Sequence, residues 1–287
     1  MNDNSKNPNK VCFIIAHKYY RDYELSFSYG YESYLNLYIN RIFENYQDAL
    51  VIVVDNNSLH KEDIFSKIDN KLNVVLLDNN IESKFEIGAY QVGLSYLIDK
   101  KIDDEYDYLF LTQDNFILNK KYDLSILHKS GVRACPIVSW KQDIWCMDDV
   151  GKFLDDLDMN NNRDKITFCW CSSFVIHKSN VLTLHNLFKK LVIETRYHHC
   201  AGERFLARIL WELNDHSNFD IDGDMENLKY DCFWVNPYDD GIDSYFVKRR
   251  QTKAGNISEI EFMGYTEESD LNRSKKQYIR YEHKEME

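Results

Sequence analysis

Four short runs of apolar residues in the first half of the chain, each ending in a polar cluster, most constrain its fold. They cover residues 11–16, 50–54, 73–77 and 109–111. Short apolar runs bounded by polar residues are typical of strands buried on both faces. Such strands belong to parallel sheets that helices cover on either side. The pattern therefore predicts an α/β fold with a mostly parallel central sheet and helices on both faces.

Helical periodicity fills the segments between these runs. Residues 34–46 carry apolar side chains at helical spacing, and a second stripe covers residues 85–100. In a parallel sheet the carboxyl ends of the strands lie along one edge, where ligands bind. We therefore expect the polar clusters to meet there. Further along, the pattern predicts strands over 132–140 and 167–176, helices over 179–193 and 202–214, and a polar loop over 155–165.

We expect a single domain, because no Pro/Gly-rich linker divides the chain and no internal repeat is present. Residues 11–266 form the predicted domain. The polar, Asn-rich residues 1–10 are expected to be a disordered tail, and residues 267–287 a charged, solvated one.

The composition excludes several classes of protein. A formal net charge of −12 argues against binding to nucleic acid, which needs a broad basic surface. No apolar run approaches the roughly 18 residues of a membrane span, and the N-terminus does not read as a secretory signal. Seven scattered cysteines favour a reducing compartment, so the predicted location is cytoplasmic. The wealth of Asn, Lys, Ile, Asp and Tyr suggests an AT-rich genome such as that of a large DNA virus, which would mean host cytoplasm or the virion.

Two aspartates stand at strand ends. Asp114 closes the run Thr112-Gln113-Asp114, which makes it the candidate centre of the active site. The alternative role for Asp114 is to cap a turn or helix. Asp55 begins Asp55-Asn56-Asn57-Ser58, where it could bind a ligand or stabilise an Asx-turn. Both roles can hold, because a carboxylate has two oxygens.

Taken together, these residues resemble a GT-A-fold glycosyltransferase of the nucleotide-sugar-dependent kind. Residues 51–58 look like the second strand of that family and its nucleotide-binding turn. Asn79-Asn80 followed by residues 85–90 is similar to a segment of the rhamnan-synthesis branch. Residues 109–114 occupy the place of the DxD strand, and residues 202–206 resemble the acidic helix start after the acceptor strand.

The resemblance implies transfer of a sugar from a nucleoside diphosphate donor to a glycan or protein-linked acceptor. It divides the predicted domain into a nucleotide-sugar half at 11–118, an acceptor half at 119–220 and a closing segment at 221–266. The candidate nucleotide-sugar-binding residues in these segments are His17, Asp55, Asn56, Glu86, Gly88 and Gln113. Lys248, Arg249 and Arg250, with Lys253, form the only dense basic cluster of the sequence, which we expect either to bind the diphosphate or to lie on a solvated surface strand.

The resemblance also implies a metal ion and a base. Asp114 would hold Mn²⁺ or Mg²⁺, although Thr112 replaces the family's first acid. Glu203 would take the proton of the acceptor hydroxyl, in a single displacement that inverts the anomeric carbon. The alternative for Glu203 is a favourable interaction with the dipole of a helix that it opens. His198 and His199 could contact the acceptor or the metal, but adjacent histidines tend to point apart.

Other sequence features have weaker chemical interpretations. Cys169 and Cys171 would share a strand face, but no second close pair completes a zinc site, so buried structural cysteines are expected. The acidic run from Asp220 to Asp224 fits a calcium loop poorly. Trp140, Trp145 and Trp170 could stack on sugars or belong to the core.

Two other functions compete with sugar transfer. A degenerate GT-A domain would bind sugars or glycans without turnover, and the missing acid at Thr112 favours it. A nucleotidyltransferase would share the sheet but needs a Gly-rich loop after the first strand, which Ala16-His17-Lys18-Tyr19 is not.

Overall fold

The structure is a computed structural model, in which most of the chain up to residue 214 is described. The described residues are 10–17, 32–58, 61–68, 73–114, 116–118, 120–122, 124, 127, 133–137, 139–140, 147–157, 159, 168–169, 172–214 and 246–248. The predicted tail at 267–287 and all but the last residue of the tail at 1–10 lie outside these ranges. Within the predicted closing segment, 221–266, only residues 246–248 are described.

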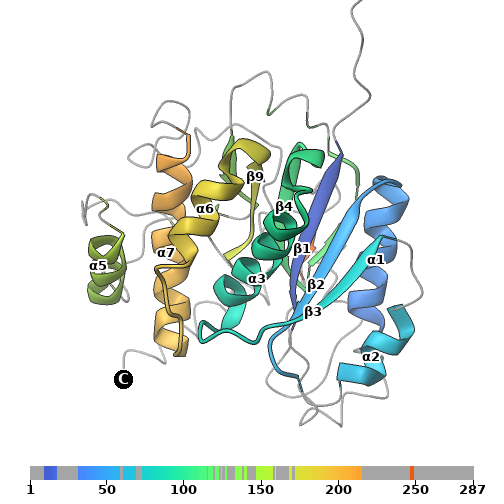
Figure 1. Ribbon diagram of the computed structural model, residues 1–287, viewed down its shortest axis with the longest axis horizontal. Helices are drawn as coiled ribbons and strands as arrows, with labels where there is room; N and C mark the ends of the chain where they lie inside the picture. Colours follow the sequence, from blue (N-terminus) through green and yellow to red (C-terminus); the bar gives the residue numbers. More distant parts are fainter. Residues whose placement is uncertain are drawn as a thin grey trace, which may run out of the picture.

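A six-stranded sheet with the order β3-β2-β1-β4-β9-β6 forms the centre of the molecule (Figure 1). The first four strands of that order pair in parallel, whereas β9 runs antiparallel to both β4 and β6. The predicted mostly parallel sheet is therefore confirmed. The bounds are β1 Val11–His17, β2 Leu50–Asp55, β3 Val74–Asp78, β4 Tyr108–Gln113, β6 Ala134–Pro136 and β9 Phe174–His177.

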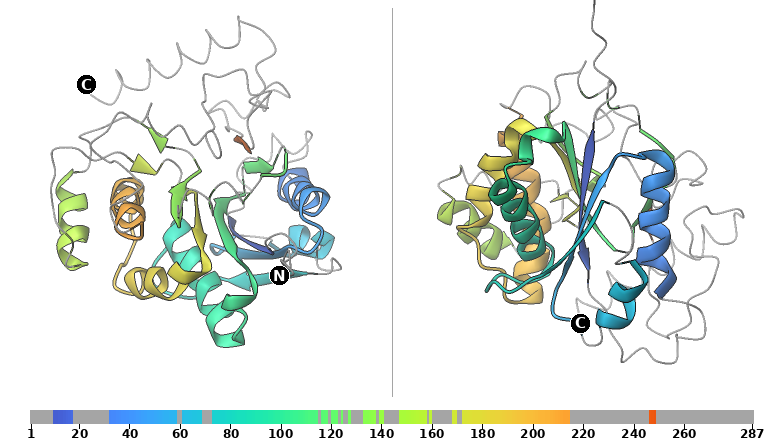
Figure 2. Two further views of the ribbon diagram at one scale, coloured as in Figure 1. Left: turned by 90° about the horizontal axis from the view of Figure 1, so that it is seen from above. Right: turned by 45° about the vertical axis from the view of Figure 1, so that its right-hand side comes forward.

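Helices cover both faces of this sheet, as the sequence predicts (Figure 2). On one face lie α1 (Glu32–Asn45) and α2 (Lys61–Ile68). On the other lie α3 (Phe85–Lys100), α6 (Val181–Phe188) and α7 (Arg196–Glu212), with α5 (Met147–Asp156) packed outside α7. Short elements complete the described part: η2 Asp103–Glu105, β5 Phe116–Leu118, β7 Ser139–Trp140, β8 Phe168–Cys169, η5 Lys178–Asn180 and β10 Phe246–Lys248.

The core has two parts, because successive side chains of a strand point to opposite faces of the sheet. Phe13 belongs to the part under α1 and stacks on Phe110, with ring centroids 4.6 Å apart. Ile14 belongs to the part under α3, where a Cβ on Gly93 would lie 2.5 Å from its side chain. Gly93 thus lets α3 pack closely on the central strand, and every residue of β1 is buried.

Several predicted elements differ from the structure. Residues 155 and 156 were expected in a loop, but they end α5, whose apolar residues Val150, Phe153 and Leu154 pack into the core. That prediction was wrong because the acidic residues occupy only the exposed side of an amphipathic helix. The predicted strand 167–176 divides into β8 and β9 at Ser172, whose φ of 48° lies in the left-handed region. The strand predicted over 132–140 likewise divides into β6 and β7, and α2 and β5 were not predicted.

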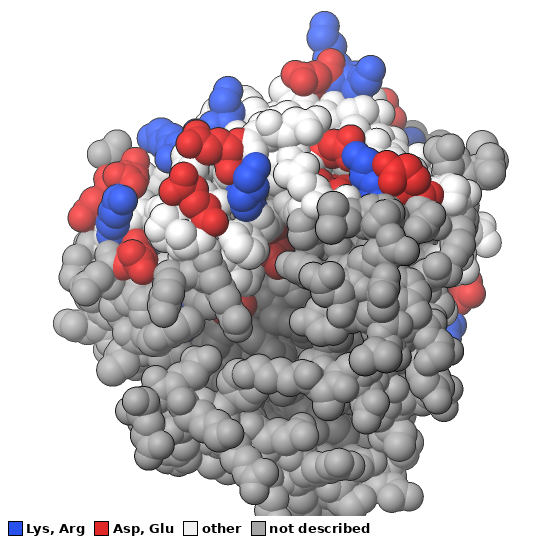
Figure 3. Space-filling model, turned by 90° about the horizontal axis from the view of Figure 1, so that it is seen from below, with Lys and Arg blue, Asp and Glu red and all other residues white. Residues whose placement is uncertain are grey.

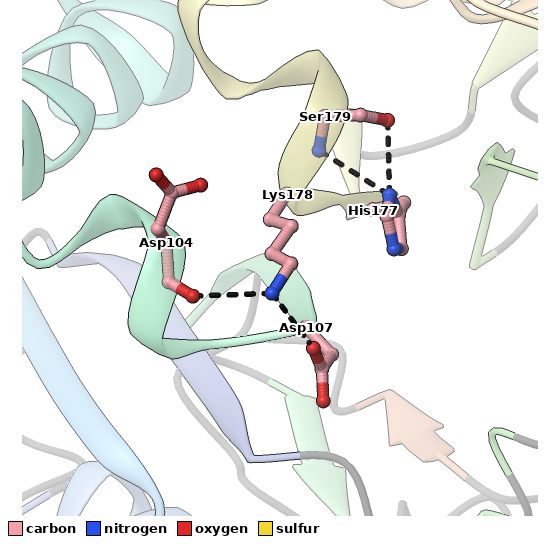
Figure 4. Close-up of polar contacts among 5 residues, drawn as sticks. All are labelled: Asp104, Asp107, His177, Lys178 and Ser179. Atoms are coloured by element: carbon pink, nitrogen blue, oxygen red, sulfur yellow. Dashed lines mark hydrogen bonds and ion pairs between the residues drawn. The ribbon is translucent and has the colours of Figure 1, made fainter.

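Polar contacts at the start of β4 close the sheet edge opposite the predicted site (Figure 4). Lys178 forms an ion pair with Asp107 at 3.1 Å and donates a hydrogen bond to the carbonyl of Asp104 at 3.2 Å. The backbone N–H of Ser179 donates to Nδ1 of His177 at 3.2 Å. These contacts fix the chain as it leaves β9 and enters α6. No helix in the described part of the chain is long and apolar enough to cross a membrane.

Candidate functional site at the carboxyl edge of the sheet

The polar residues that end β1 to β4 lie side by side, as predicted. In the sheet register His17 is opposite Asp55, Asp55 is opposite Asp78, and Ala16 is opposite Gln113. Backbone hydrogen bonds continue past the strand ends: the N–H of Asn56 donates to His17 at 2.9 Å, and that of Asp114 to Ala16 at 3.1 Å. The edge is therefore a continuous row of polar side chains fixed by the sheet.

The row is divided between the two faces of the sheet. Strand alternation places His17, Asp55 and Thr112 on the α1/α2 face, together with the core residues that precede them. Gln113 points to the α3/α7 face, where it contacts Glu86. Two adjacent residues of the sequence, Gln113 and Asp114, thus belong to different groups of side chains.

His17 and Asp114 form a close pair on the α1/α2 face. The Nδ1 atom of His17 lies 2.7 Å from Oδ2 of Asp114. His17 is only 1% exposed, and its ring lies 6.2 Å from that of Phe65 in α2. Its Nε2 atom is buried and has no hydrogen-bond partner among the described residues. Asp114 therefore fixes the imidazole with one nitrogen still unsatisfied.

Asp55 has the turn role that the sequence left open to it, and ligand binding by Asp55 stays a prediction. Its Oδ2 accepts a hydrogen bond from the backbone N–H of Ser58 at 2.8 Å, which is the Asx-type turn. Its Oδ1 is buried and, within the described part of the chain, makes no hydrogen bond. Asn56 supports the turn from the side, since its Oδ1 accepts from Nδ2 of Asn79 at 2.8 Å. One carboxylate oxygen of Asp55 thus builds the turn, and the other is buried without a hydrogen-bond partner among the described residues.

Thr112, at the position of the family's first acid, has a structural role. It is fully buried, and its hydroxyl accepts a hydrogen bond from Tyr38 of α1 at 2.9 Å. Asp114 already pairs with His17, and the described residues contain no group of three or more His, Cys, Asp or Glu side chains that could hold a metal ion. A single protein carboxylate can still hold Mn²⁺ or Mg²⁺ when the phosphates of a substrate complete the shell of the ion. Metal binding by Asp114 stays a prediction.

Glu86 is the centre of the group on the α3/α7 face. Its Oε1 accepts a hydrogen bond from Nε2 of Gln113 at 2.5 Å, and its Oε2 lies 2.7 Å from Nδ1 of His199. The contact with His199 is an ion pair without hydrogen-bond geometry. Burial by itself would raise the pKa of Glu86, but the charge of His199 and the hydrogen bonds to the carboxylate outweigh burial and lower it below the ordinary 4.5. Glu86 therefore links β4, α3 and α7 as a carboxylate.

The two adjacent histidines of α7 point apart, as the sequence suggested. The His199 ring stacks on Phe85, with centroids 5.2 Å apart, whereas the His198 ring meets Phe153 of α5 edge-on at 5.5 Å. His198 is also fixed by the helix start, because its backbone N–H donates to the side chain of the N-cap residue Thr195 at 3.1 Å. Only His199 thus reaches the site. No local sequence pattern signals its pairing with Glu86.

Glu203 is not at the start of a helix. α7 begins at Arg196, so Glu203 lies about two turns further along it. The prediction that Glu203 opens the helix was therefore wrong, because the cap at Thr195 was overlooked. Glu203 follows His199 by one turn and lies on the same side of α7. Glu203 lies beyond the first turn of α7, where the helix dipole acts, so the dipole alternative does not apply to it.

Gly88 has a packing role in this structure. A Cβ on Gly88 would lie 2.0 Å from the carbonyl oxygen of Ser83 and 2.7 Å from Nδ2 of Asn79. The loop before α3 therefore closes over Gly88, and a side chain there would open it. Contact of Gly88 with a nucleotide stays a prediction.

Lys248, the first residue of the basic cluster, pairs through its backbone with the strand that follows Asp114. β10 pairs antiparallel with β5, and Lys248 is opposite Phe116, which follows Asp114 by two positions. The side chain of Lys248 and the whole of Arg249 and Arg250 lie outside the described residues. The backbone of Lys248 thus lies beside β5, the strand that follows Asp114.

The remaining candidates add little to this edge. Cys169 is buried, and its thiol donates to the carbonyl of Ser173 at 3.2 Å, which is a structural contact. Cys171, Trp145, Trp170 and the acidic run from residue 220 to residue 224 lie outside the described residues. From the side onto which the strand ends open, acidic and basic side chains are interspersed over the described surface (Figure 3).

No protein-family model and no curated protein matches this sequence. Among solved structures, TarS of S. aureus matches over 45% of this chain and 21% of its own, at 16% identity and a TM-score of 0.32. The WbbM bifunctional glycosyltransferase matches over 66% of this chain and 35% of its own, at 15% identity and a TM-score of 0.33. The mannosyltransferase Ktr4p of S. cerevisiae matches over 69% and 64%, at 10% identity and a TM-score of 0.38.

This chain thus spans between about a fifth and two thirds of the length of these structures. Similarity at this level does not decide what the chain does.

Proposed function

We propose that this protein is a glycosyltransferase that moves a sugar from a nucleoside diphosphate donor to a glycan or protein-linked acceptor. The observation that carries the proposal is Asp55, which ends a central parallel strand with one oxygen in a turn and the other buried and unsatisfied. A buried polar atom without a partner costs about 1–3 kcal/mol, which a bound ligand would recover. The carboxyl edge of such a sheet is where nucleotides bind.

The reaction needs a base for the acceptor hydroxyl, positive charge for the leaving diphosphate and contacts to the sugar hydroxyls, and the chain offers a candidate for each. The bond from the anomeric carbon to the diphosphate breaks while the acceptor oxygen forms a new bond to that carbon. Glu203 is the proposed acceptor of the hydroxyl proton, because it lies beyond His199 on the side of α7 that reaches the site. The leaving diphosphate needs positive charge, and the proposed source is the basic cluster that begins at Lys248. Glu86 and Gln113 would contact sugar hydroxyls.

Calorimetric titration of UDP, GDP and dTDP tests the nucleotide part of the proposal. We expect at least one of them to bind, and Asp55→Asn to weaken that binding by about 5- to 150-fold, or 1–3 kcal/mol. Asn can still accept the hydrogen bond from Ser58 but presents an amide N–H₂ in place of the free oxygen. The matched control is Asp78→Asn on the next strand, where the carboxylate is 40% exposed and pairs with Lys61, and it should bind normally. Absence of binding by all three at millimolar concentration would refute the proposal.

A second function is favoured by Thr112, whose hydroxyl is committed to Tyr38. A domain of the same fold that binds sugars or glycans without turnover would tolerate this replacement of an acid. The two functions differ in one measurement. The measurement is the rate at which nucleoside diphosphate is formed from a bound sugar donor in the presence of acceptors. A donor that binds tightly but is cleaved only slowly with every acceptor would indicate a binding module.

A further inference from the structure

The two edge strands of the central sheet, β6 and β3, differ in how their free backbone is protected. The side chain of Asn214, which follows α7, covers the outer side of β6. Its amide oxygen accepts from the N–H of Ala134 at 3.0 Å, and its amide nitrogen donates to the carbonyl of Ala134. Pro136, the last residue of this short strand, has no N–H to offer. The β6 edge is therefore closed to pairing with another strand.

β3, at the opposite end of the sheet, has a free backbone edge (Figure 1). The N–H of Asn79, directly after the strand, donates to the carbonyl of Asp55 at 2.8 Å, so every second residue before Asn79 also bonds to β2. The backbones of Val74, Leu76 and Asp78 therefore point away from β2. Those of Val74 and Leu76 have no hydrogen-bond partner among the described residues. An edge of this kind is a template for pairing with another chain.

The side chains along this edge are apolar and only partly buried. Residues 74–77 read Val-Val-Leu-Leu, with no charge or proline to block pairing, and each of them keeps part of its surface exposed. Charge stands at the carboxyl end of the strand, where Asp78 forms an ion pair with Lys61 of α2. A partner for this edge must therefore be an extended, uncharged and apolar strand with a free edge of its own.

We infer that β3 pairs with β3 of a second copy of this chain, so that the sheets of the two copies become continuous. β3 itself meets the description of the partner. Two identical strands related by a two-fold axis must run antiparallel. The register that uses every outward backbone group places Leu76 of one copy opposite Leu76 of the other, and Val74 of each copy opposite Asp78 of the other.

Charge favours this register over its neighbours. It keeps the Asp78 carboxylates of the two copies about 13 Å apart along the strands, whereas a shift toward the carboxyl ends would bring them together. The Val75 side chain of each copy then meets Leu77 of the other on the α3 face, so that apolar surface is buried on apolar surface. This inference does not depend on the proposed function.

Light scattering of the full chain after size exclusion, over a series of concentrations, tests the association. We expect the mass to rise from that of one chain toward that of two, in about 0.3 M NaCl, which screens the repulsion between two copies of net charge −12. Leu76→Pro removes an outward N–H but no bond to β2, so it should keep the fold and weaken association by at least about 10-fold.

The matched control is Leu182→Lys, which removes an apolar side chain that is 57% exposed on α6, on the other side of α3 from β3 (Figures 1 and 2). This variant should associate as the unmodified chain does. Melting temperatures show whether each variant is folded, and if Leu76→Pro unfolds, cysteine variants decide.

Cysteine variants test the register itself. In Leu76→Cys the two new thiols would be opposite each other across the axis, with Cα atoms about 5.5 Å apart, which a disulfide can bridge. In Val74→Cys they would be about 13 Å apart along the strands, which is too far. After mild oxidation we expect a covalent dimer of Leu76→Cys on a non-reducing gel, and none of Val74→Cys or of the unmodified chain.

Two results would overturn the inference. The mass of a single chain at every concentration would leave the β3 edge to a strand of another protein. Equal cross-linking of Leu76→Cys and Val74→Cys would show that the copies meet by random collision and not in this register. Neither result bears on nucleotide binding, so the proposed function would stand or fall by its own test.

Discussion

At the scale of single residues, the packing beside the site depends on how much space surrounds each helical glycine. Gly88 and Gly202 are both helical glycines in segments that resemble one family, yet their surroundings differ. A Cβ on Gly88 would lie 2.0 Å from a backbone oxygen of the loop before α3, which cannot move aside as a flexible side chain could. A Cβ on Gly202 would lie 3.6 Å from the ring of Phe205, an ordinary contact.

Gly88→Ala is therefore expected to destabilise the protein by about 1–3 kcal/mol, the usual cost of overpacking a closed site. The control Gly202→Ala should be neutral or stabilise by up to about 1 kcal/mol, because alanine is the better helix former. Urea denaturation of both variants measures the difference in unfolding free energy. Equal stability of the two variants would contradict the packing role of Gly88.

At the scale of secondary structure elements, Glu86 holds the beginnings of α3 and α7 together through His199. The Glu86 and His199 side chains are 14% and 19% exposed, so the pair is mostly screened from solvent. His199→Gln leaves the carboxylate buried without its positive partner and should cost about 1–3 kcal/mol of unfolding free energy, less than for a fully buried pair. His198→Gln is the control, since the His198 ring contacts Phe153 instead of a carboxylate. Denaturant unfolding at neutral pH compares them, and equal losses would show that His199 contributes only packing.

A substitution of Glu203 tests whether α7 carries the catalytic base. Glu203→Gln keeps the size of the side chain but removes the basic oxygen, so turnover should fall by about 10²–10⁴-fold while donor binding is kept. Glu212→Gln makes the same change near the other end of α7, where Glu212 pairs with Arg208 at 2.9 Å, and should leave turnover unaffected. Transfer rates onto an acceptor glycan measure the effect. Turnover of Glu203→Gln near that of the unmodified protein would remove Glu203 as the base.

At the scale of the whole molecule, two groups make stability depend on pH in the same direction. Burial lowers the pKa of His185 below its ordinary 6.5, with Lys189 adding to the effect, so the folded state favours the neutral ring. The contribution of the neutral His185 ring to the unfolding free energy is complete above pH 6.5 and is lost as the pH falls through the lowered pKa. The lowered pKa of Glu86 acts likewise below pH 4.5, where protonation removes its ion pair.

The unfolding free energy should therefore fall in two stages as the pH is lowered from 8 to about 4, the first below His185's ordinary pKa and the second below that of Glu86. His185→Gln should flatten the first stage only, because the amide that replaces the ring does not titrate. His185 contacts Ser95 of α3 at 2.8 Å, far from the proposed site, so nucleotide binding should be unchanged. Urea midpoints measured across this range check both stages. A first stage that persists in His185→Gln would assign it to another group.

The sequence by itself determined the parallel strands, the two helices at 34–46 and 85–100, and the edge at which the polar clusters meet. Apolar runs and helical stripes are local patterns, and parallel strands align their carboxyl ends whatever the packing. It also identified the Asp55 turn, because an Asx-turn is made within four residues. Sugar transfer, its donor and acceptor, the metal and the cytoplasmic location stay predictions.

Only the tertiary structure decided which face of the sheet each polar residue serves. Gln113 and Asp114 are neighbours in sequence, yet their partners are Glu86 on one face and His17 on the other. These partners come from different strands and helices, and no local pattern encodes which of them meet. The pairing of His199 with Glu86 likewise depends on how α7 packs beside α3. Long-range packing therefore decided that Asp114 orients a histidine, a contact that its place at a strand end could not predict.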